Sequence, residues 1–420
     1  MMARSGALRV EAEEETVEEQ VLEILKSEVN LLIFPLFFLS KRGRGSKIEY
    51  RAEIQRGGEK IELLWQVTPH PEYGSLGVFD KKVFKAIEYR ISKMGFPIRN
   101  PIPFSIYEIC KEMGFKRFGG TEYEKVKDSL KRITVTPVES RGTFYSKAKE
   151  GWIDEVFHLY ERVIFKGERL PDGATAETNY LYLGSWYLEN LNALYIRPLN
   201  YRYYRSLRNV IARRLYELLG VKFYGIWESE RHCIRYRYST LCQLLPLARQ
   251  WYLSLAKQQL EPAHAELIDT DFLSEVEWRE IPSEDDEKDW LISYFPGPRV
   301  KEEIAQAKGR LEGREPAREL PPSEAEDEAF IKGLARAMVE ALEDEESYPF
   351  YRKLATLCLE RPLLEDLVYQ VLSEVKDEYH RGKIRKSKGA LFTDKIKRYC
   401  QERGIDLGLK RGGSGRDKPS

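Results

Sequence analysis

Apolar residues recur at helical spacing in three successive segments of the first half of the chain, at 80–95, 105–114 and 121–133. The second and third segments each open on Ser or Thr followed three residues later by Glu, which is the pattern of a capping box. Residues 134–145 then alternate as two short strands about a central turn, and 157–165 form a further strand pattern. Three helices followed by a hairpin is the element order of a winged helix.

The same order recurs farther along the chain. Helical patterns cover 206–220, 239–245 and 247–259, and strand patterns at 272–278 and 290–295 flank an acidic loop. This repetition predicts a second winged helix directly after the first.

The predicted fold class is α+β, with tandem winged-helix domains followed by a small C-terminal all-α domain of four helices. Segment 298–327 is rich in charged residues and proline, which is typical of a solvated linker. The predicted divisions are an acidic N-terminal lead-in (1–30), winged-helix domain 1 (31–185), winged-helix domain 2 (186–297), a charged linker (298–327), a C-terminal helical domain (328–408) and a disordered tail (409–420).

The balance of charge conceals a segregation along the chain. The 420 residues carry 68 Lys+Arg and 68 Asp+Glu, so no net field of the whole molecule attracts nucleic acid. Segment 197–214, however, holds six Arg and no acid, interleaved with Tyr201, Tyr203 and Tyr204. Guanidinium groups grip phosphate oxygens, and tyrosines add hydroxyl donors or stacking faces. Segment 381–398 holds eight Lys or Arg against one acid.

These basic segments and the third helix of each predicted unit supply the candidate DNA contacts. On 247–259 the spacing predicts Leu247, Trp251 and Leu255 facing inward. The alternative is that the charge runs are solvated faces, or that a third helix packs on its neighbouring domain. The candidate DNA-binding residues are Lys125, Lys127, Lys131, Arg132, Arg141 in the predicted turn, Arg202, Arg205, Arg208, Arg249, Gln250, Lys257, Arg385, Lys386 and Lys388.

Motifs of catalysis and cofactor binding are absent from the sequence. It has no P-loop, no dinucleotide-binding glycine pattern after a strand, no HExxH and no paired-cysteine framework. Asp269-Thr270-Asp271 resembles a metal-binding DxD but has no further ligands nearby, so a structural loop is the preferred interpretation. We therefore expect no cofactor, no metal and no enzymatic activity.

The longest apolar run, Leu31 to Leu39, is too short to span a bilayer and contains Pro35. No basic segment precedes it that would suggest a signal peptide. We expect a cytoplasmic protein without a membrane segment.

Several stretches resemble the bacterial plasmid replication initiator protein A family. They are Phe34 to Ser40 with Lys47 to Arg51, Val78 to Asp80, Pro103 to Gly114, Tyr123 to Leu130, Leu260 to His264 with Phe272-Leu273, and Gly382 to Arg398. The resemblance spans about residues 33–405. It implies a non-enzymatic initiator that binds repeated sites in double-stranded origin DNA and recruits host replication proteins, the helicase or its loader. It also implies, by analogy, a switch between a homodimer and an origin-binding monomer.

Three alternatives remain open from the residues. A winged-helix transcriptional regulator would use the same contacts and would repress a reporter without supporting plasmid replication. A primase or nickase would show metal-dependent cleavage or primer synthesis. A protein-binding scaffold would have no affinity for DNA at low salt.

Overall fold

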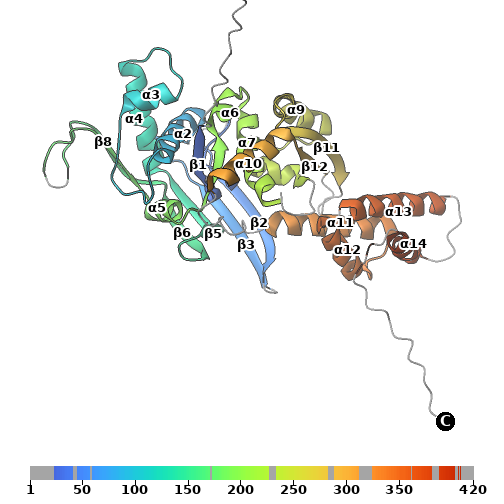
Figure 1. The fold of residues 1–420 in the computed structure, drawn as a ribbon. Helices are drawn as coiled ribbons and strands as arrows, with labels where there is room; N and C mark the ends of the chain where they lie inside the picture. Colours follow the sequence, from blue (N-terminus) through green and yellow to red (C-terminus); the bar gives the residue numbers. More distant parts are fainter. Residues whose placement is uncertain are drawn as a thin grey trace, which may run out of the picture.

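The computed structural model describes residues 23–40, 45–56, 59–170, 173–226, 233–281, 288–311, 324–360, 362–380, 387–402, 405 and 407. These residues form helices and antiparallel sheets in mixed order, which confirms the α+β class (Figure 1). The expected tail at 409–420 and most of the acidic lead-in lie outside the described residues. Figure 1 places α3 and α4 at one end of the molecule and the helices α11–α14 at the other.

A first unit spans residues 78–183 and is interrupted by one insertion. Its first strand pairs with its last, which pairs in turn with the middle one, giving the order β4-β8-β7. The three predicted helices are all present. The elements are α2 (Val78–Ser92), β4 (Ile102–Phe104), α3 (Ile106–Glu112), α4 (Gly120–Val135), β7 (Tyr160–Ile164) and β8 (Asn179–Leu183).

The helix starts of this unit differ from the predicted capping boxes. Ser105 precedes α3, but its side chain makes no capping hydrogen bond. The helix α4 begins at Gly120, before Thr121, and the Glu122 carboxylate accepts a hydrogen bond of 3.0 Å from the Gly119 N–H. An acid inside the first turn thus satisfies one of the free N–H groups that the helix start leaves.

The predicted hairpin at 134–145 is wrong in position. Strand β5 (Pro137–Ser146) runs through the expected turn, and the chain reverses at 147–150 before β6 (Gly151–His158). Gly142, which suggested a turn, lies in a bulge of β5 with a φ of +60°. Glycine adopts this left-handed conformation without steric cost, so the same residue serves a bulge as well as a turn.

Strands β5 and β6 belong to a separate four-stranded sheet of order β2-β3-β5-β6. Its other half is a hairpin that the sequence pattern did not reveal, formed by β2 (Ile48–Arg56) and β3 (Glu59–Val67). The predicted strand at 157–165 is two strands, because β6 ends at His158 and β7 begins at Tyr160. The insertion therefore separates α4 from the hairpin of its own unit.

The N-terminal segment joins this unit to the next one. Strand β1 (Ile24–Glu28) pairs antiparallel with β9 (Ile196–Asn200), and the short helix α1 (Val29–Ile33) follows β1 directly. Helix α5 (Ser185–Asn192) leads into β9, and α6 (Tyr201–Ser206) leads out of it. The apolar run that begins in α1 is buried, as expected for core.

A second unit spans residues 210–296 and repeats the plan of the first. A helix, a strand, two helices and two strands follow one another, and the sheet order is again first strand, last strand, middle strand (β10-β12-β11). The elements are α7 (Val210–Ile226), β10 (Ile234–Arg237), α8 (Tyr238–Leu244), α9 (Leu253–Asp269), β11 (Leu273–Ile281) and β12 (Asp289–Pro296).

The boundaries of two predicted helices in this unit are wrong. The expected helix 206–220 is divided between α6 and α7, and Asn209 caps α7 by accepting from the Ile211 N–H at 2.8 Å. The expected helix 247–259 begins only at Leu253 and continues through Pro262 to Asp269. Pro262 is exposed, so the helix carries it on the side away from the core.

The end of the chain forms a helical bundle with its own core. Within the expected linker, α10 (Pro298–Leu311) buries Val300 and Ile304 in the main core. The four predicted C-terminal helices are present as α11 (Glu324–Leu342), α12 (Tyr348–Glu360), α13 (Pro362–His380) and α14 (Lys388–Glu402). Their apolar cluster includes Ile281 and Leu291 of β11 and β12, so the bundle packs on the sheet of the second unit.

Candidate nucleic-acid interface

In the first unit, α3 and α4 are successive helices in contact with each other, joined by residues 113–119, as the predicted helix–turn–helix requires. Val126, Leu130 and Ile133 of α4 are buried, as the periodicity predicted, and α4 packs against α2 and α3. The opposite face of α4 exposes Thr121, Glu124, Lys125 and Asp128. The second helix of such a motif is the one that enters the major groove, with its N-terminal residues toward the base edges.

The four predicted cations of α4 have different surroundings. Lys125 is exposed. The ammonium of Lys127 lies 2.7 Å from the Glu124 carboxylate, and that of Lys131 lies 5.7 Å from the centre of the Phe165 ring. Arg132 is turned inward, donating to Asp80 at 2.5 Å and to the Tyr73 carbonyl at 2.7 Å. Of these four cations, Lys125 is the one whose side chain is exposed, whereas the other three are half-buried.

The hairpin β7–β8 lies beside α4, as the contact of Lys127 and Lys131 with Phe165 shows, and it projects from the molecule in Figure 1. The described part of its connecting loop exposes Lys166 and Arg169. Sequence reasoning missed these two residues. The Pro171-Asp172-Gly173 sequence between two apolar strands is a turn signal that marks such a hairpin.

In the second unit, the corresponding motif is α8, residues 245–252 and α9. Trp251 and Leu255 were predicted to face inward, which is wrong: their exposed fractions are 58% and 43%. Because α9 starts later than predicted, Trp251 lies in the loop and the buried stripe is Ala256, Leu260, Ala263 and Leu267. The outward face of the first turns of α9 holds Ser254, Leu255, Gln258 and Glu261.

The polar candidates of this motif lie around its loop. Arg249 donates to the Lys288 carbonyl at 3.0 Å, and its guanidinium lies 5.1 Å from the centre of the Trp251 ring. The Gln250 amide donates to the Ala248 carbonyl at 3.3 Å. Lys257, on α9, is half-buried. Arg249 and Gln250 therefore precede the helix instead of lining it.

The basic run 197–214 is divided by burial. Arg202, Arg205 and Arg208 are exposed on and after α6, whereas Arg197 and Arg214 are buried. Arg205 pairs with Glu23 at 2.8 Å. The tyrosines of the run are not stacking faces for a ligand, because Tyr201, Tyr203 and Tyr204 are all buried in the core. Of the residues in this run that were expected to contact phosphate, the exposed ones are therefore arginines and not tyrosines.

The remaining candidates lie away from both motifs. Arg141 is exposed within β5 and pairs with Glu139 at 2.6 Å. The Lys388 ammonium contacts the Glu343 carboxylate at 2.7 Å and lies 3.8 Å from the centre of the Tyr379 ring, inside the C-terminal bundle. Arg385 and Lys386 lie outside the described residues.

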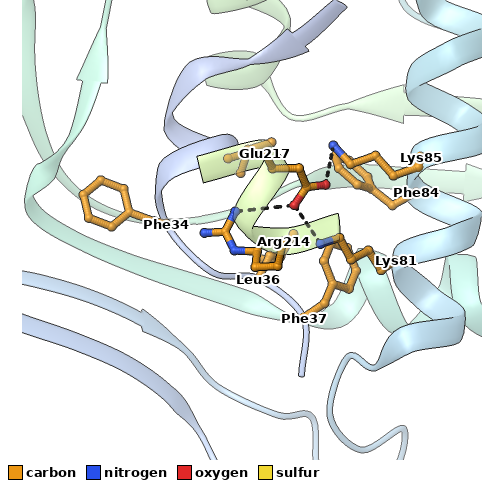
Figure 2. Close-up of a pocket in the computed structure, with 9 residues that line it drawn as sticks. Phe34, Leu36, Phe37, Lys81, Phe84, Lys85, Arg214 and Glu217 are labelled. Atoms are coloured by element: carbon orange, nitrogen blue, oxygen red, sulfur yellow. Dashed lines mark hydrogen bonds and ion pairs between the residues drawn. The ribbon is translucent and has the colours of Figure 1, made fainter. Parts of the chain in front are cut away.

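A buried group of charged side chains joins the two units. In this inter-unit ion cluster (Lys81, Lys85, Arg214 and Glu217), the Glu217 carboxylate lies 2.7 Å from Lys81, 3.3 Å from Lys85 and 3.5 Å from Arg214 (Figure 2). The lysines come from α2 of the first unit, and the other two residues come from α7 of the second. These four residues line a small pocket together with apolar residues such as Phe37.

Hydrogen bonds extend this cluster into the N-terminal segment. Arg214 donates to the carbonyls of Leu32 and Ile33, both at 2.6 Å, and so caps the end of α1. Burial disfavours the charge of Glu217, but the surrounding cations outweigh it and lower the pKa of Glu217 to about 2. The carboxylate is therefore ionised at neutral pH.

Within the described residues, no group of three or more potential metal ligands occurs. His264 is buried against Tyr294 at 3.1 Å, and burial lowers its pKa to about 4. Asp269 closes α9, and Asp271 lies in the turn before β11. No described helix is long and apolar enough to cross a membrane.

The family model of replication initiator protein A matches residues 26–239, which is more than half of the chain. The chain belongs to the replication initiator protein A family. The matched region contains the whole first unit, α7 and the first strand of the second unit. This family member is also similar to a solved structure described as selenomethionine derivatives of domain 2 and domain 3 of RctB. The TM-score is 0.35 and the identity 17%, over 64% of this chain and 98% of that chain. A search of the curated proteins finds no match.

Proposed function

We propose that the protein initiates replication by binding repeated sites in double-stranded origin DNA through two winged helices. The observation that carries this proposal is the repeated unit, in which helix, strand, helix, helix and hairpin share one sheet order and leave the second helix of the motif exposed. That element and sheet order is the one found in winged helices. Membership of the initiator family supports replication as the outcome.

In this proposal, α4 and α9 each enter a major groove. Lys166 and Arg169 of the β7–β8 hairpin and the exposed Arg202, Arg205 and Arg208 contact phosphates and fix the register of the protein on the duplex. Contacts from two units along one duplex favour bending or local strain of an A·T-rich segment, which would assist opening.

The inter-unit ion cluster supports a fixed orientation of the two units. Charges buried to this degree are costly unless each has its partners in good geometry, so the cluster favours one arrangement of α2 against α7. A fixed arrangement would let the protein select sites in which two groove contacts occur at one spacing.

We further propose that the protein acts without catalysis, in the bacterial cytoplasm, on a plasmid. Recruitment of the host helicase or its loader, and a switch between a homodimer and an origin-binding monomer, also belong to the proposal by analogy with other initiators. The helical bundle α11–α14, which packs outside both DNA-binding motifs, is the part we assign to host contacts.

The test of this function is a replication assay. A plasmid without its own origin receives the encoding gene and its flanking DNA, and we expect it to be maintained in a suitable host. A variant with Lys125→Ala, Lys166→Ala and Arg169→Ala should fail although it folds. Repression of a reporter by the same flanking DNA, without maintenance of the plasmid, would favour a transcriptional regulator and contradict the proposal.

A further inference from the structure

The start of α9 carries four large exposed apolar side chains within five consecutive residues. Trp251, Tyr252, Leu253 and Leu255 have exposed fractions of 58%, 70%, 36% and 43%, and they account for half of the large hydrophobic side chains exposed on the described residues. Isolated exposed apolar residues are ordinary, but a contiguous group marks a binding surface.

We propose that this surface, the α9 apolar edge (residues 251–255), reads A·T base pairs by contact with the 5-methyl groups of thymine. The inference rests on the proposed function and names the bases that the second unit prefers. Residues at the start of the second helix of a helix–turn–helix face the base edges. In the major groove, the thymine methyl group is the apolar feature that a protein can read.

The surroundings of the edge favour DNA as the occupant. Arg249 lies against the Trp251 ring and is held to the backbone of Lys288 at the foot of β12, and Lys257 lies one turn into α9. Arg249 and Lys257, both half-buried, precede and follow the edge in the sequence, and cations so close to an apolar edge complement the phosphates beside a groove. Glu261 is the acid on the outward face, two turns into the helix, and limits the surface that can approach DNA.

The outward residues of α9 beyond the edge fit the same base pairs. Gln258 is exposed one turn after Ser254. Glutamine forms a pair of hydrogen bonds with the N6 and N7 atoms of adenine, whereas serine can hydrogen-bond to more than one base. A side-chain set of Leu, Gln and Ser therefore recognises thymine methyl groups and adenine edges.

In the first unit, the exposed residues at the start of α4 are mostly charged and suit G·C rather than A·T base pairs. The exposed residues at the start of α4 are Thr121, Glu124, Lys125 and Asp128. Lysine donates to guanine O6 and N7, and carboxylates accept from the cytosine amino group. We infer a composite site in which the half facing α9 is rich in A·T pairs and the half facing α4 contains G·C pairs.

The experiment replaces thymine by deoxyuridine, which lacks only the 5-methyl group. The half-sites are first assigned by tethered cleavage from an iron chelate on Thr121→Cys or Ser254→Cys, since the five native cysteines are buried. Deoxyuridine in the half facing α9 should weaken binding by about fourfold per contacted methyl group. The same replacement in the half facing α4 should leave the affinity unchanged.

Protein variants complete the test. Trp251→Ala and Leu255→Ala should lower affinity for thymine-containing DNA and remove the response to deoxyuridine. Val156→Ala, at another exposed apolar residue on β6, is the control and should change neither the affinity nor the response to deoxyuridine. Circular dichroism verifies that each variant is folded.

Two outcomes separate this inference from the proposed function. Specific binding that is insensitive to deoxyuridine in the half facing α9, or unchanged in Trp251→Ala and Leu255→Ala, would overturn the inference and leave the origin-binding function standing. Absence of specific binding to any flanking DNA would overturn the function itself.

Discussion

Glu217 is the residue on which the contact between the two units converges. Its carboxylate meets Lys81, Lys85 and Arg214 in a site closed to solvent. Removing one partner of such a cluster leaves the other charges buried without compensation, which costs more than the intact pair contributes. Glu217 is therefore the point at which the contact between α2 and α7 is most sensitive to a single change.

We expect Glu217→Gln to lower the free energy of unfolding by about 3–5 kcal/mol at neutral pH. Because the pKa of Glu217 is depressed from 4.5 to about 2 in the folded protein, its contribution is present above pH 4.5 and is lost as the pH falls from 4.5 toward 2. Denaturant titrations across this pH range should show the free energy of unfolding of the wild type approaching that of Glu217→Gln as the pH falls.

Glu72→Gln, at an exposed position, serves as the control and should change stability by less than about 0.5 kcal/mol. A Glu217→Gln protein as stable as the wild type at pH 7, or a difference that stays constant down to pH 2, would contradict the assigned role of the cluster.

Lys125 is the exposed cation at the start of α4. If it contacts a base edge, Lys125→Ala should reduce discrimination at one position of the site by about 1–3 kcal/mol, with little change in binding to unrelated DNA. Competition gel shifts against single-base variants measure this. Lys353→Ala, at an exposed position of α12 outside both basic segments, is the control and should have no effect. An equal loss of affinity for all sequences in Lys125→Ala would show that Lys125 contacts only phosphate.

At the residue scale, the sequence identified which types of side chain matter but not which are accessible. The run 197–214 crosses β9, α6 and the start of α7, so no single period describes it. Arg197 lies under the Tyr224 ring at 4.4 Å, whereas Arg208 is exposed, although both belong to the same run. Tertiary packing determines which of these arginines is buried, and the order of charges along the chain does not reveal it.

At the scale of elements, long amphipathic helices were predictable and their ends were not. The apolar faces of α2 and α4 follow the period of 3.6 residues and are buried as expected, whereas the face of α7 is buried at Leu215 and Leu218 and only partly at Val210 and Ile211. Leu247 and Trp251 also fit that spacing by chance, which placed the start of α9 too early. The hairpin β7–β8 was not predicted from the sequence. Strands β6 and β7 follow one another almost without a break, so two strands of different sheets gave one strand pattern.

In the proposed function, the hairpin β7–β8, which shares the sheet of its own unit with β4, contacts DNA as a wing, and β5–β6 does not. Lys166→Ala with Arg169→Ala should reduce the slope of log affinity against log salt by up to about two, because each phosphate contact releases about one counterion. Arg141→Ala with Lys149→Ala, in the other hairpin, is the matched control and should leave the slope unchanged. A slope that falls in the Arg141→Ala/Lys149→Ala variant but not in the Lys166→Ala/Arg169→Ala variant would show that β5–β6, and not β7–β8, contacts DNA.

At the scale of the whole molecule, the chain holds two copies of one unit in a fixed relation. The first helices of the copies, α2 and α7, share the inter-unit ion cluster, and β1 pairs with β9 between them. Sequence patterns revealed the repetition but gave no indication of this contact, because its four charged residues come from helices more than a hundred residues apart.

A fixed relation has a measurable consequence for the DNA site. Inserting about five base pairs between the two half-sites turns one of them by half of a ~10-base-pair turn. We expect affinity to fall to that of one half-site, as measured by gel shift. The same insertion outside the site is the control. Unchanged affinity for the interrupted site would mean that the two units move independently.

We propose that the protein recognises particular sites in origin DNA through both of its units. Hydroxyl-radical footprinting of the DNA flanking the encoding gene, with the full-length protein at physiological salt, tests it most directly. We expect protection of repeated sequences, each with two groove contacts on one face of the duplex, and binding of these sites at least about a thousandfold tighter than of unrelated DNA. Uniform, sequence-independent protection would contradict it.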